Sequence, residues 1–458
     1  MDRIPPEVLL HIFQFLDGPA PSQVRLRDQP SSDMLDVTPQ LSHSLKTVSY
    51  VCRTWRTLAL PSLFRHVLWK PKISSLSAFT LNPIPLLRFL EDNRLDRSAM
   101  TFTMVVDFQD KEADARHITP EIRSVDLEWL WDQLFSVIDP LRFTMIAPPN
   151  TLAAFMSRML FLDDAWSFSI PYHILSLARS KRGPSRDRSS KEHLEAQLSA
   201  LQVSSPTAET TSTSPSGAES SAAAASAMGS SSSTSQATRY RKPPACPLFT
   251  ARPWTSILLN EGSSTRVYRT YEFFLRRPPS MLGALLGCEE HPNNVPLLPP
   301  TIIDFNYIAI FPLSSHFEVL LQHLPKLDRL FVQLTPRPGN RILEDEDEMK
   351  YIDPADLWME RNTSYSSLMR ELTFVADPDP DVDVDPGNWE TLRVFESGDA
   401  ADQEAWEIAV KFLERNARRG WKVEREGVFV KCDDEGNPPG AKREVDGHGG
   451  GVKSTLLV

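Results

Sequence analysis

The stretch Val8-Leu9-Leu10-His11-Ile12-Phe13-Gln14-Phe15-Leu16 decides the N-terminal fold, because all but two of its positions are apolar. Pro5 or Pro6 before it suits a helix start, Glu7 suits the first turn, and Asp17-Gly18 after it supplies a stop. A helix on a protein surface needs only one apolar stripe. The sequence therefore predicts a helix with more apolar surface than a single neighbour covers.

A second helical segment is predicted from residue 45 to residue 60, followed by Pro61-Ser62-Leu63-Phe64. Apolar residues recur there at spacings of three and four, which is the period of a helix. They are Val48, Val51, Trp55, Leu58 and Ala59. A module this small buries a modest fraction of its surface. Some of the apolar surface of residues 8–16 must therefore be covered by the downstream chain or by another protein.

Several short segments follow one another in a characteristic order. They are Ile4-Pro5-Pro6-Glu7-Val8-Leu9, Ile12-Phe13, Leu16, Val48-Ser49-Tyr50-Val51-Cys52-Arg53-Thr54-Trp55-Arg56, Leu58-Ala59 and Leu63-Phe64. This succession resembles the F-box, and it covers residues 1–70. The resemblance implies a three-helix module that binds the Skp-type adaptor of cullin-RING ubiquitin ligases. The contact set it implies is Ile4, Pro5, Leu9, Ile12, Leu16, Val51, Cys52 and Trp55.

The sequence departs from the family between the first two helices, where the family has a short connection. Residues 18–40 contain Pro19, Pro21, Pro30 and Pro39, which indicate an inserted loop. A surface loop of this length is tolerated, because closure entropy grows slowly with length. Such a loop could still obstruct the adaptor face. The alternative interpretation of the apolar N-terminal positions is a helical cap on the downstream region.

The rest of the chain alternates between short β-rich runs and helical runs, which predicts an α/β fold. It forms two parts, residues 71–178 and residues 246–431. Strands are expected at Met100–Phe108, Leu141–Ala147, Trp166–Ile170, Ile302–Phe311, Leu330–Leu334, Leu372–Val375 and Leu392–Phe395. Helices are expected at Leu127–Ile138, Leu152–Leu162, Phe317–Leu324 and Gln403–Arg418.

Leucines in this region are placed as in a leucine-rich repeat, most clearly in residues 324–334. The spacing between similar segments varies from about 20 to about 45 residues, whereas regular repeats keep about 20–29. The pattern resembles the degenerate leucine-rich solenoids of fungal-type F-box proteins. That resemblance implies an irregular solenoid with a concave face for protein recognition. An ordinary α/β domain without a designated groove is the alternative.

Residues 179–245 separate the two parts and are rich in serine, alanine and threonine. Such a segment buries too little apolar surface to offset its ordering entropy, so we expect it to be disordered. The basic residues from Arg179 to Lys191 could serve as a nuclear localisation signal, although most such runs are simply solvated. Residues 432–458 are expected to be a flexible tail.

Composition narrows the partners and the compartment. The net charge of -11 disfavours nucleic acid as a partner. No run approaches the ~20 apolar residues of a spanning helix, so no membrane role is expected. The four cysteines show no paired spacing, which suits a reducing compartment. We expect a cytoplasmic or nuclear protein, or one present in both.

Motifs for catalysis, metals and cofactors are weak or missing. The chain has no glycine-rich phosphate loop, no Gly-x-Ser-x-Gly and no His-Glu-x-x-His. Cys288-Glu289-Glu290-His291 has no second pair of ligands nearby, and residues 377–385 are expected to form a solvated acidic loop. We therefore expect no metal, no cofactor and no enzymatic activity.

The leading hypothesis is the substrate-recognition subunit of an SCF-type (Skp-cullin-F-box) ubiquitin ligase, which brings a client protein to the catalytic machinery. Two alternatives stay open. One is an F-box scaffold that acts outside the ligase. The other is an enzyme whose active site is assembled from residues far apart in the sequence, because such sites leave no local trace.

Overall fold

The computed structural model describes most of the chain. The described residues are 4–19, 21–31, 34, 39–71, 81–106, 122–160, 171–182, 246–277, 280–290, 293–373, 388–416 and 420–432. The insert expected to be disordered, except for residues 179–182, lies outside this set. So do the strand expected at Trp166–Ile170, the acidic run 377–385 and the tail after Cys432.

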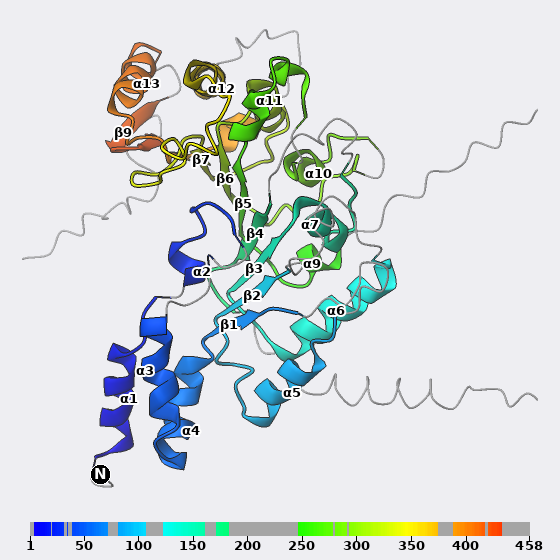
Figure 1. The fold of residues 1–458 in the computed structure, drawn as a ribbon, viewed down its shortest axis with the longest axis vertical. Helices are drawn as coiled ribbons and strands as arrows, with labels where there is room; N and C mark the ends of the chain where they lie inside the picture. Colours follow the sequence, from blue (N-terminus) through cyan, green and yellow to red (C-terminus); the bar gives the residue numbers. More distant parts are fainter. Residues whose placement is uncertain are drawn as a thin grey trace, which may run out of the picture. The chain divides into compact units, whose positions relative to one another are not determined.

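The N-terminal module is helical (Figure 1). Its helices are α1 (Pro6–Phe15), α2 (Pro21–Val24), α3 (Pro39–Ser49) and α4 (Arg53–Leu63). Pro6 starts α1, and Glu7 lies in its first turn as expected. The predicted second helical segment is divided between α3 and α4 at Tyr50-Val51-Cys52, because the Cys52 Sγ accepts a hydrogen bond from the Trp55 amide and caps α4.

The remainder is built around a ten-stranded sheet of order β1-β2-β3-β4-β5-β6-β7-β8-β10-β9. The strands are β1 (His66–Trp69), β2 (Thr101–Val105), β3 (Arg142–Ala147), β4 (His173–Ala178), β5 (Ser256–Ser263), β6 (Asp304–Ile310), β7 (Arg329–Gln333), β8 (Val394–Ser397), β9 (Trp421–Arg425) and β10 (Val428–Lys431). β1 to β3 are parallel, and so are β5 to β8. β4 is antiparallel to both neighbours, and β10 pairs antiparallel with β8 and β9.

One face of the sheet carries most of the helices (Figure 1). They are α5 (Ile84–Asp92), α6 (Ser124–Val137), α7 (Pro149–Phe155), α9 (Pro247–Thr250), α10 (Leu282–Leu286), α11 (Ser314–Gln322), α12 (Pro354–Thr373) and α13 (Gln403–Arg415). The short 3-10 helices are η2 (Thr265–Arg269), η3 (Phe273–Leu275) and η4 (Asn388–Thr391). All these α-helices contribute to the main core. Because these helices pack on the sheet around one core, the body has an α/β fold.

The other face of the sheet has a smaller apolar core. β6 shows the division: Phe305 and Tyr307 belong to the main core, whereas Ile308 and Ile310 face the smaller one. Leu26 and Met34 of the N-terminal region join this smaller core. A strand covered on both faces reads as a nearly continuous apolar run, which is why Ile302–Phe311 is recognisable from sequence.

The expected solenoid is wrong: the body is one continuous sheet. A leucine-rich solenoid keeps its successive strands parallel. Here the chain reverses at β4, which runs antiparallel to β3 and to β5. The predicted repeat segment 324–334 supplies the end of a loop and β7, and its leucines pack into an ordinary helix-covered core.

The strand expected at Leu372–Val375 is also wrong where the structure describes it. Leu372 and Thr373 form the last turn of α12. Buried residues of α12 recur at Leu357, Tyr365, Leu368 and Leu372, which is helical spacing. A short apolar run does not distinguish a strand from the end of a buried helix.

The segment inserted between α1 and α3 folds back onto the sheet. Leu26 and Met34 are buried, and the side-chain amide of Asn260 in β5 donates to the carbonyl oxygens of Leu26 and Asp28 at 2.9 and 2.8 Å. β5 has an irregularity in register between Asn260 and Ser263, and Gly262 there has φ +74°. Bulges of this kind redirect side chains, and this one lets β5 hold the inserted segment.

Candidate functional site

Helix α1 has two apolar stripes that face in different directions. Leu9, Phe13 and Leu16 follow one another at spacings of four and three, which places them along one side of the helix. Val8, Ile12 and Phe15 repeat the same spacing one position earlier, about 100° around the axis. One stripe is enough to join α1 to α3 and α4, so the second requires a separate explanation.

The first stripe forms the module's own core. Leu9 is 5% exposed and Phe13 is 1% exposed, and both pack with Leu45 and Ala59. The Phe13 ring meets the Trp55 ring edge to face, with centroids 5.6 Å apart. These contacts hold the helices together and stabilise the geometry of the second stripe.

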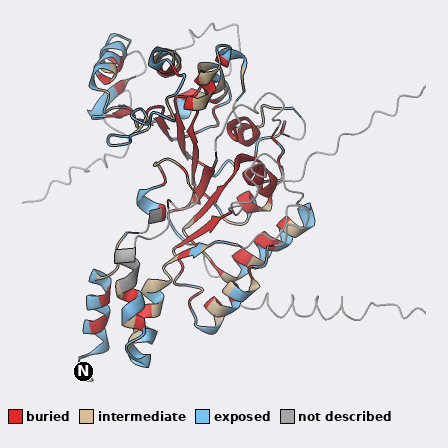
Figure 2. Ribbon diagram, in the orientation of Figure 1, coloured by how far each residue is buried: buried red, intermediate tan, exposed pale blue. Residues whose placement is uncertain are grey.

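The second stripe is exposed, and Figure 2 shows most of α1 in the colour of exposed residues. Val8 is 46% exposed, Ile12 is 44% exposed and Phe15 is 90% exposed. None of the described residues buries them. Large apolar side chains grouped in this way mark a protein interaction surface rather than a fold core.

The structure divides the eight predicted contact residues into three groups. Ile4, Pro5, Ile12, Val51 and Cys52 are exposed, Leu16 and Trp55 are half-buried, and Leu9 is buried. Leu9 therefore acts within the module's core in this structure. The half-buried pair packs against the same core.

Other exposed residues of the module lie outside the predicted contact set. The large apolar ones among the described residues of helices α1 to α4 and their connections are Val8, Leu10, Phe15, Val24 and Tyr50. The signal that could have found Val8 and Phe15 is the near-continuous apolar run of residues 8–16, which provides a second stripe once the first is assigned to the core. Tyr50, which is 70% exposed, precedes the cap of α4 and has no such periodic signal.

A family model described as F-box-like matches residues 1–69. The N-terminal module is an F-box-like domain. Its three longer helices, α1, α3 and α4, lie within the match. No curated protein and no solved structure matches the chain significantly. F-box domains generally bind Skp-type adaptors.

The inserted segment of the F-box-like domain makes polar and ionic contacts with strands β6, β7 and β8. The Arg27 guanidinium lies 3.6 Å from the centroid of the Phe331 ring. Its two terminal nitrogens reach Glu396 Oε1 at 3.3 Å and Asn306 Oδ1 at 3.1 Å. Glu396 also pairs with Arg329, and these guanidinium groups keep its pKa below the usual range although burial raises it.

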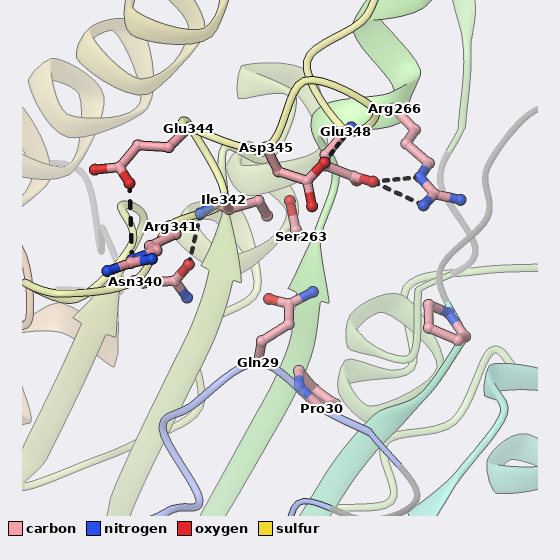
Figure 3. Close-up of a pocket in the computed structure, with 11 residues that line it drawn as sticks. Gln29, Pro30, Ser263, Arg266, Asn340, Arg341, Ile342, Glu344, Asp345 and Glu348 are labelled. Atoms are coloured by element: carbon pink, nitrogen blue, oxygen red, sulfur yellow. Dashed lines mark hydrogen bonds and ion pairs between the residues drawn. The ribbon is translucent and has the colours of Figure 1, made fainter.

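A groove lies between this segment and the loop that follows β7, beside the ends of β5, β6 and β7 (Figure 3). Figure 3 shows one part, with a volume of about 590 Å³, in which Gln29 points toward Ser263. Glu348 in its wall accepts hydrogen bonds from Thr265 Oγ1 at 3.0 Å and from Arg266 Nε at 2.7 Å. In open α/β sheets the carboxyl ends of the strands are the usual place for ligands.

A buried polar network lies on the helix side of the same bulge. Glu261 accepts hydrogen bonds from the Tyr307 hydroxyl at 2.8 Å and from the Met281 amide at 2.7 Å, where it caps α10. His316 Nε2 lies 3.1 Å from the same carboxylate. Burial raises the pKa of Glu261, but the hydrogen bond and charge of His316 outweigh it and hold the pKa at about 2.

Among the residues that the structure describes, no group of three ligating side chains is placed to hold a metal ion. The pair Cys288-Glu289 lies near α10 without further ligands from that described set. No helix within the described ranges is long and apolar enough to cross a bilayer.

Proposed function

We propose that this chain is the substrate-recognition subunit of an SCF-type ubiquitin ligase. In this proposal, the F-box-like domain binds a Skp-type adaptor through the second stripe of α1, and the α/β body holds a client protein. Catalysis comes from other subunits of the ligase. The chain contributes proximity, because it raises the effective concentration of the client's lysines near the transferred ubiquitin.

The observation that carries the proposal is the exposure of Val8, Ile12 and Phe15 on a helix whose other stripe already forms the core. Covering a side chain of this size contributes about 1.5–3 kcal/mol. Because Val8, Ile12 and the neighbouring Ile4 and Leu10 are each less than half exposed and Phe15 is 90% exposed, the sum for the five is roughly 4–8 kcal/mol. The stripe therefore offsets a substantial part of the ~4–15 kcal/mol cost of association.

Co-purification of the full-length chain with a Skp-type adaptor tests the proposal. The variant Ile12→Asp/Phe15→Asp is expected to lose the adaptor, because two carboxylates would be buried in an apolar interface. Val125→Asp is a matched control, since Val125 is 70% exposed on α6, outside the F-box-like domain. Circular dichroism checks that both variants are folded.

Equal recovery of the adaptor by the wild-type chain and the double variant would contradict the proposal. A cullin in the same purified complex supports assembly of a ligase. Recovery of the adaptor without a cullin would instead favour a scaffold that acts outside the ligase.

A further inference from the structure

The second part of the groove is a cavity of about 350 Å³ at the same end of the sheet. One wall is the inserted segment of the F-box-like domain, from Arg25 to Gln29, and the other is the loop from Pro336 to Asn340. Ile308 and Ile310 of β6 contribute to its floor. This volume is within the range of pockets that hold small ligands or parts of a peptide.

The charge of this cavity is opposite to that of the whole chain. Three arginines, Arg25, Arg27 and Arg337, line it with a single acidic residue, Asp28, whereas the chain carries a net charge of -11. Asp28 is shared, because Arg25 Nε lies 3.2 Å from one carboxylate oxygen and Arg337 Nη1 lies 3.2 Å from the other. Arg27 is paired with Glu396, so the surplus is the one positive charge by which Arg25 and Arg337 together exceed Asp28.

The arginines also lie close enough to disfavour one another. Burial lowers the pKa of the Arg27 guanidinium, Glu396 raises it, and the charges of Arg337 and Arg329 lower it again. A bound anion would relieve this repulsion and would accept hydrogen bonds from the guanidinium groups.

Gln333 adds a requirement for a hydrogen-bond donor. It is 1% exposed and lines the cavity, and its Oε1 has no hydrogen-bond partner among the described residues. Its Nε2 donates to the Thr335 carbonyl oxygen at 3.0 Å, which fixes the orientation of the amide. Because a buried acceptor without a partner costs about 1–3 kcal/mol, a ligand with an N–H group is favoured here.

We propose that this cavity binds an acidic peptide segment, with an aspartate or glutamate carboxylate on the guanidinium N–H groups of Arg25 and Arg337 that Asp28 does not occupy. A peptide supplies the carboxylate that the arginines require and the main-chain N–H that Gln333 requires. Its aliphatic carbons match the isoleucines and prolines of the lining. A phosphate ion offers no aliphatic part, and the overall negative charge disfavours a long nucleic acid.

The inference extends the proposed function, since the bound segment would belong to the client protein. It also gives the inserted segment a role: the F-box-like domain itself provides one wall of the site, held in place by Arg27 on Phe331 and by Asn260. Arg27 is therefore a positioning residue as well as a source of charge.

Binding is tested with the full-length chain purified with its adaptor. The probes are short fluorescent peptides that contain consecutive glutamates, each paired with a counterpart that has glutamine at those positions. Fluorescence anisotropy is expected to show at least tenfold tighter binding of the glutamate peptides, because one charge-assisted hydrogen bond contributes about that factor.

The variant Arg25→Gln/Arg337→Gln is expected to lose this preference and to retain the adaptor. Arg341→Gln is the matched control, because Arg341 lies on the same loop and lines the other part of the groove. That control should bind the glutamate peptides like the wild-type chain. Arg341 is 86% exposed, so its removal is not expected to disturb the fold.

Equal affinity for glutamate and glutamine peptides would overturn the inference, and so would unchanged binding by the double variant. Full competition by inorganic phosphate would show a free-anion site instead, and preferential binding of single-stranded RNA would show a nucleic-acid site. Both results would also overturn it. Loss of the adaptor with peptide binding intact would reject only the proposed function, because the two readouts are separate.

Discussion

Asn260 and Leu26 are separated by 234 positions in the sequence, yet the Asn260 side-chain nitrogen lies 2.9 Å from the Leu26 carbonyl oxygen. This hydrogen bond, with its partner to Asp28, holds a segment of the F-box-like domain on the central strands of the body. The domain proposed to bind the adaptor and the cavity proposed to bind a client therefore share one structural element.

Asn260→Ala is expected to destabilise the protein by about 1–3 kcal/mol, because the carbonyls of Leu26 and Asp28 lose a buried donor. Urea unfolding followed by circular dichroism measures the change. Asn416→Ala is the control: Asn416 lies at the exposed end of α13, where we expect a change within ~0.5 kcal/mol. Equal stabilities of the two variants would contradict the role assigned to Asn260.

Gly262→Ala is expected to cost more stability than Gly339→Ala. Both glycines have positive φ, +74° and +86°, so each alanine is strained by about 1 kcal/mol. A Cβ at position 262 would also lie 3.3 Å from Pro30 Cδ, whereas one at position 339 would meet nothing within 4 Å. The difference between the two changes in the free energy of unfolding measures the effect of the contact with the inserted segment. Equal changes would show that this contact does not affect stability.

An alanine substitution in each stripe of α1 tests the roles of the two stripes separately. Phe13→Ala is expected to destabilise the F-box-like domain by about 3–5 kcal/mol, because it leaves a cavity in the core. Phe15→Ala should change stability by less than ~0.5 kcal/mol and weaken adaptor binding on the order of tenfold. Thermal unfolding and titration with the adaptor give the two quantities. Unchanged affinity with Phe15→Ala would argue that the second stripe does not contact the adaptor.

We expect the free energy of unfolding to depend on pH through the buried side chain of His173. It is fully buried in β4, both ring nitrogens lack a partner among the described residues, and burial lowers its pKa from 6.5 to about 4. Because the unfolded chain takes up a proton at a higher pH than the folded chain, stability falls as pH drops below about 6.5. By pH 5 this one group removes roughly 2 kcal/mol.

His173→Leu should flatten that part of the profile, since leucine does not titrate and leaves no buried polar atom. Urea unfolding at neutral pH and at pH near 5 measures it. If the wild-type chain and the variant lose equal stability over that interval, His173 is not the responsible group.

Local patterns were sufficient for several elements of the fold. The start and end of α1 and the strands β3, β6 and β7 follow from periodicity and from proline, glycine and acidic signals near their ends. The central strands β4 and β5 were not predicted. Both contain buried polar residues. Asn260 and Glu261 bond to groups in distant parts of the chain, and His173 has no hydrogen-bond partner among the described residues.

The candidate site, like the fold, could be predicted only in part from local sequence patterns. The sequence of α1 indicated an excess of apolar surface but not which stripe is buried, and so Leu9 was included with Ile12 in one contact set. The groove left no local signal, because its arginines come from the inserted segment and from the loop after β7. Charges that are far apart in sequence gather only when the sheet places their elements side by side.

By itself, the sequence determined that the first 70 residues form a small helical module with apolar surface to spare, and that an α/β region follows. These properties depend on the order of residues within a few helical turns. The tertiary structure alone decided that the body is a single mixed sheet and that the inserted segment lies against it. Those outcomes depend on hydrogen bonds and burial between residues hundreds of positions apart, such as Asn260 with Leu26, which no local pattern records.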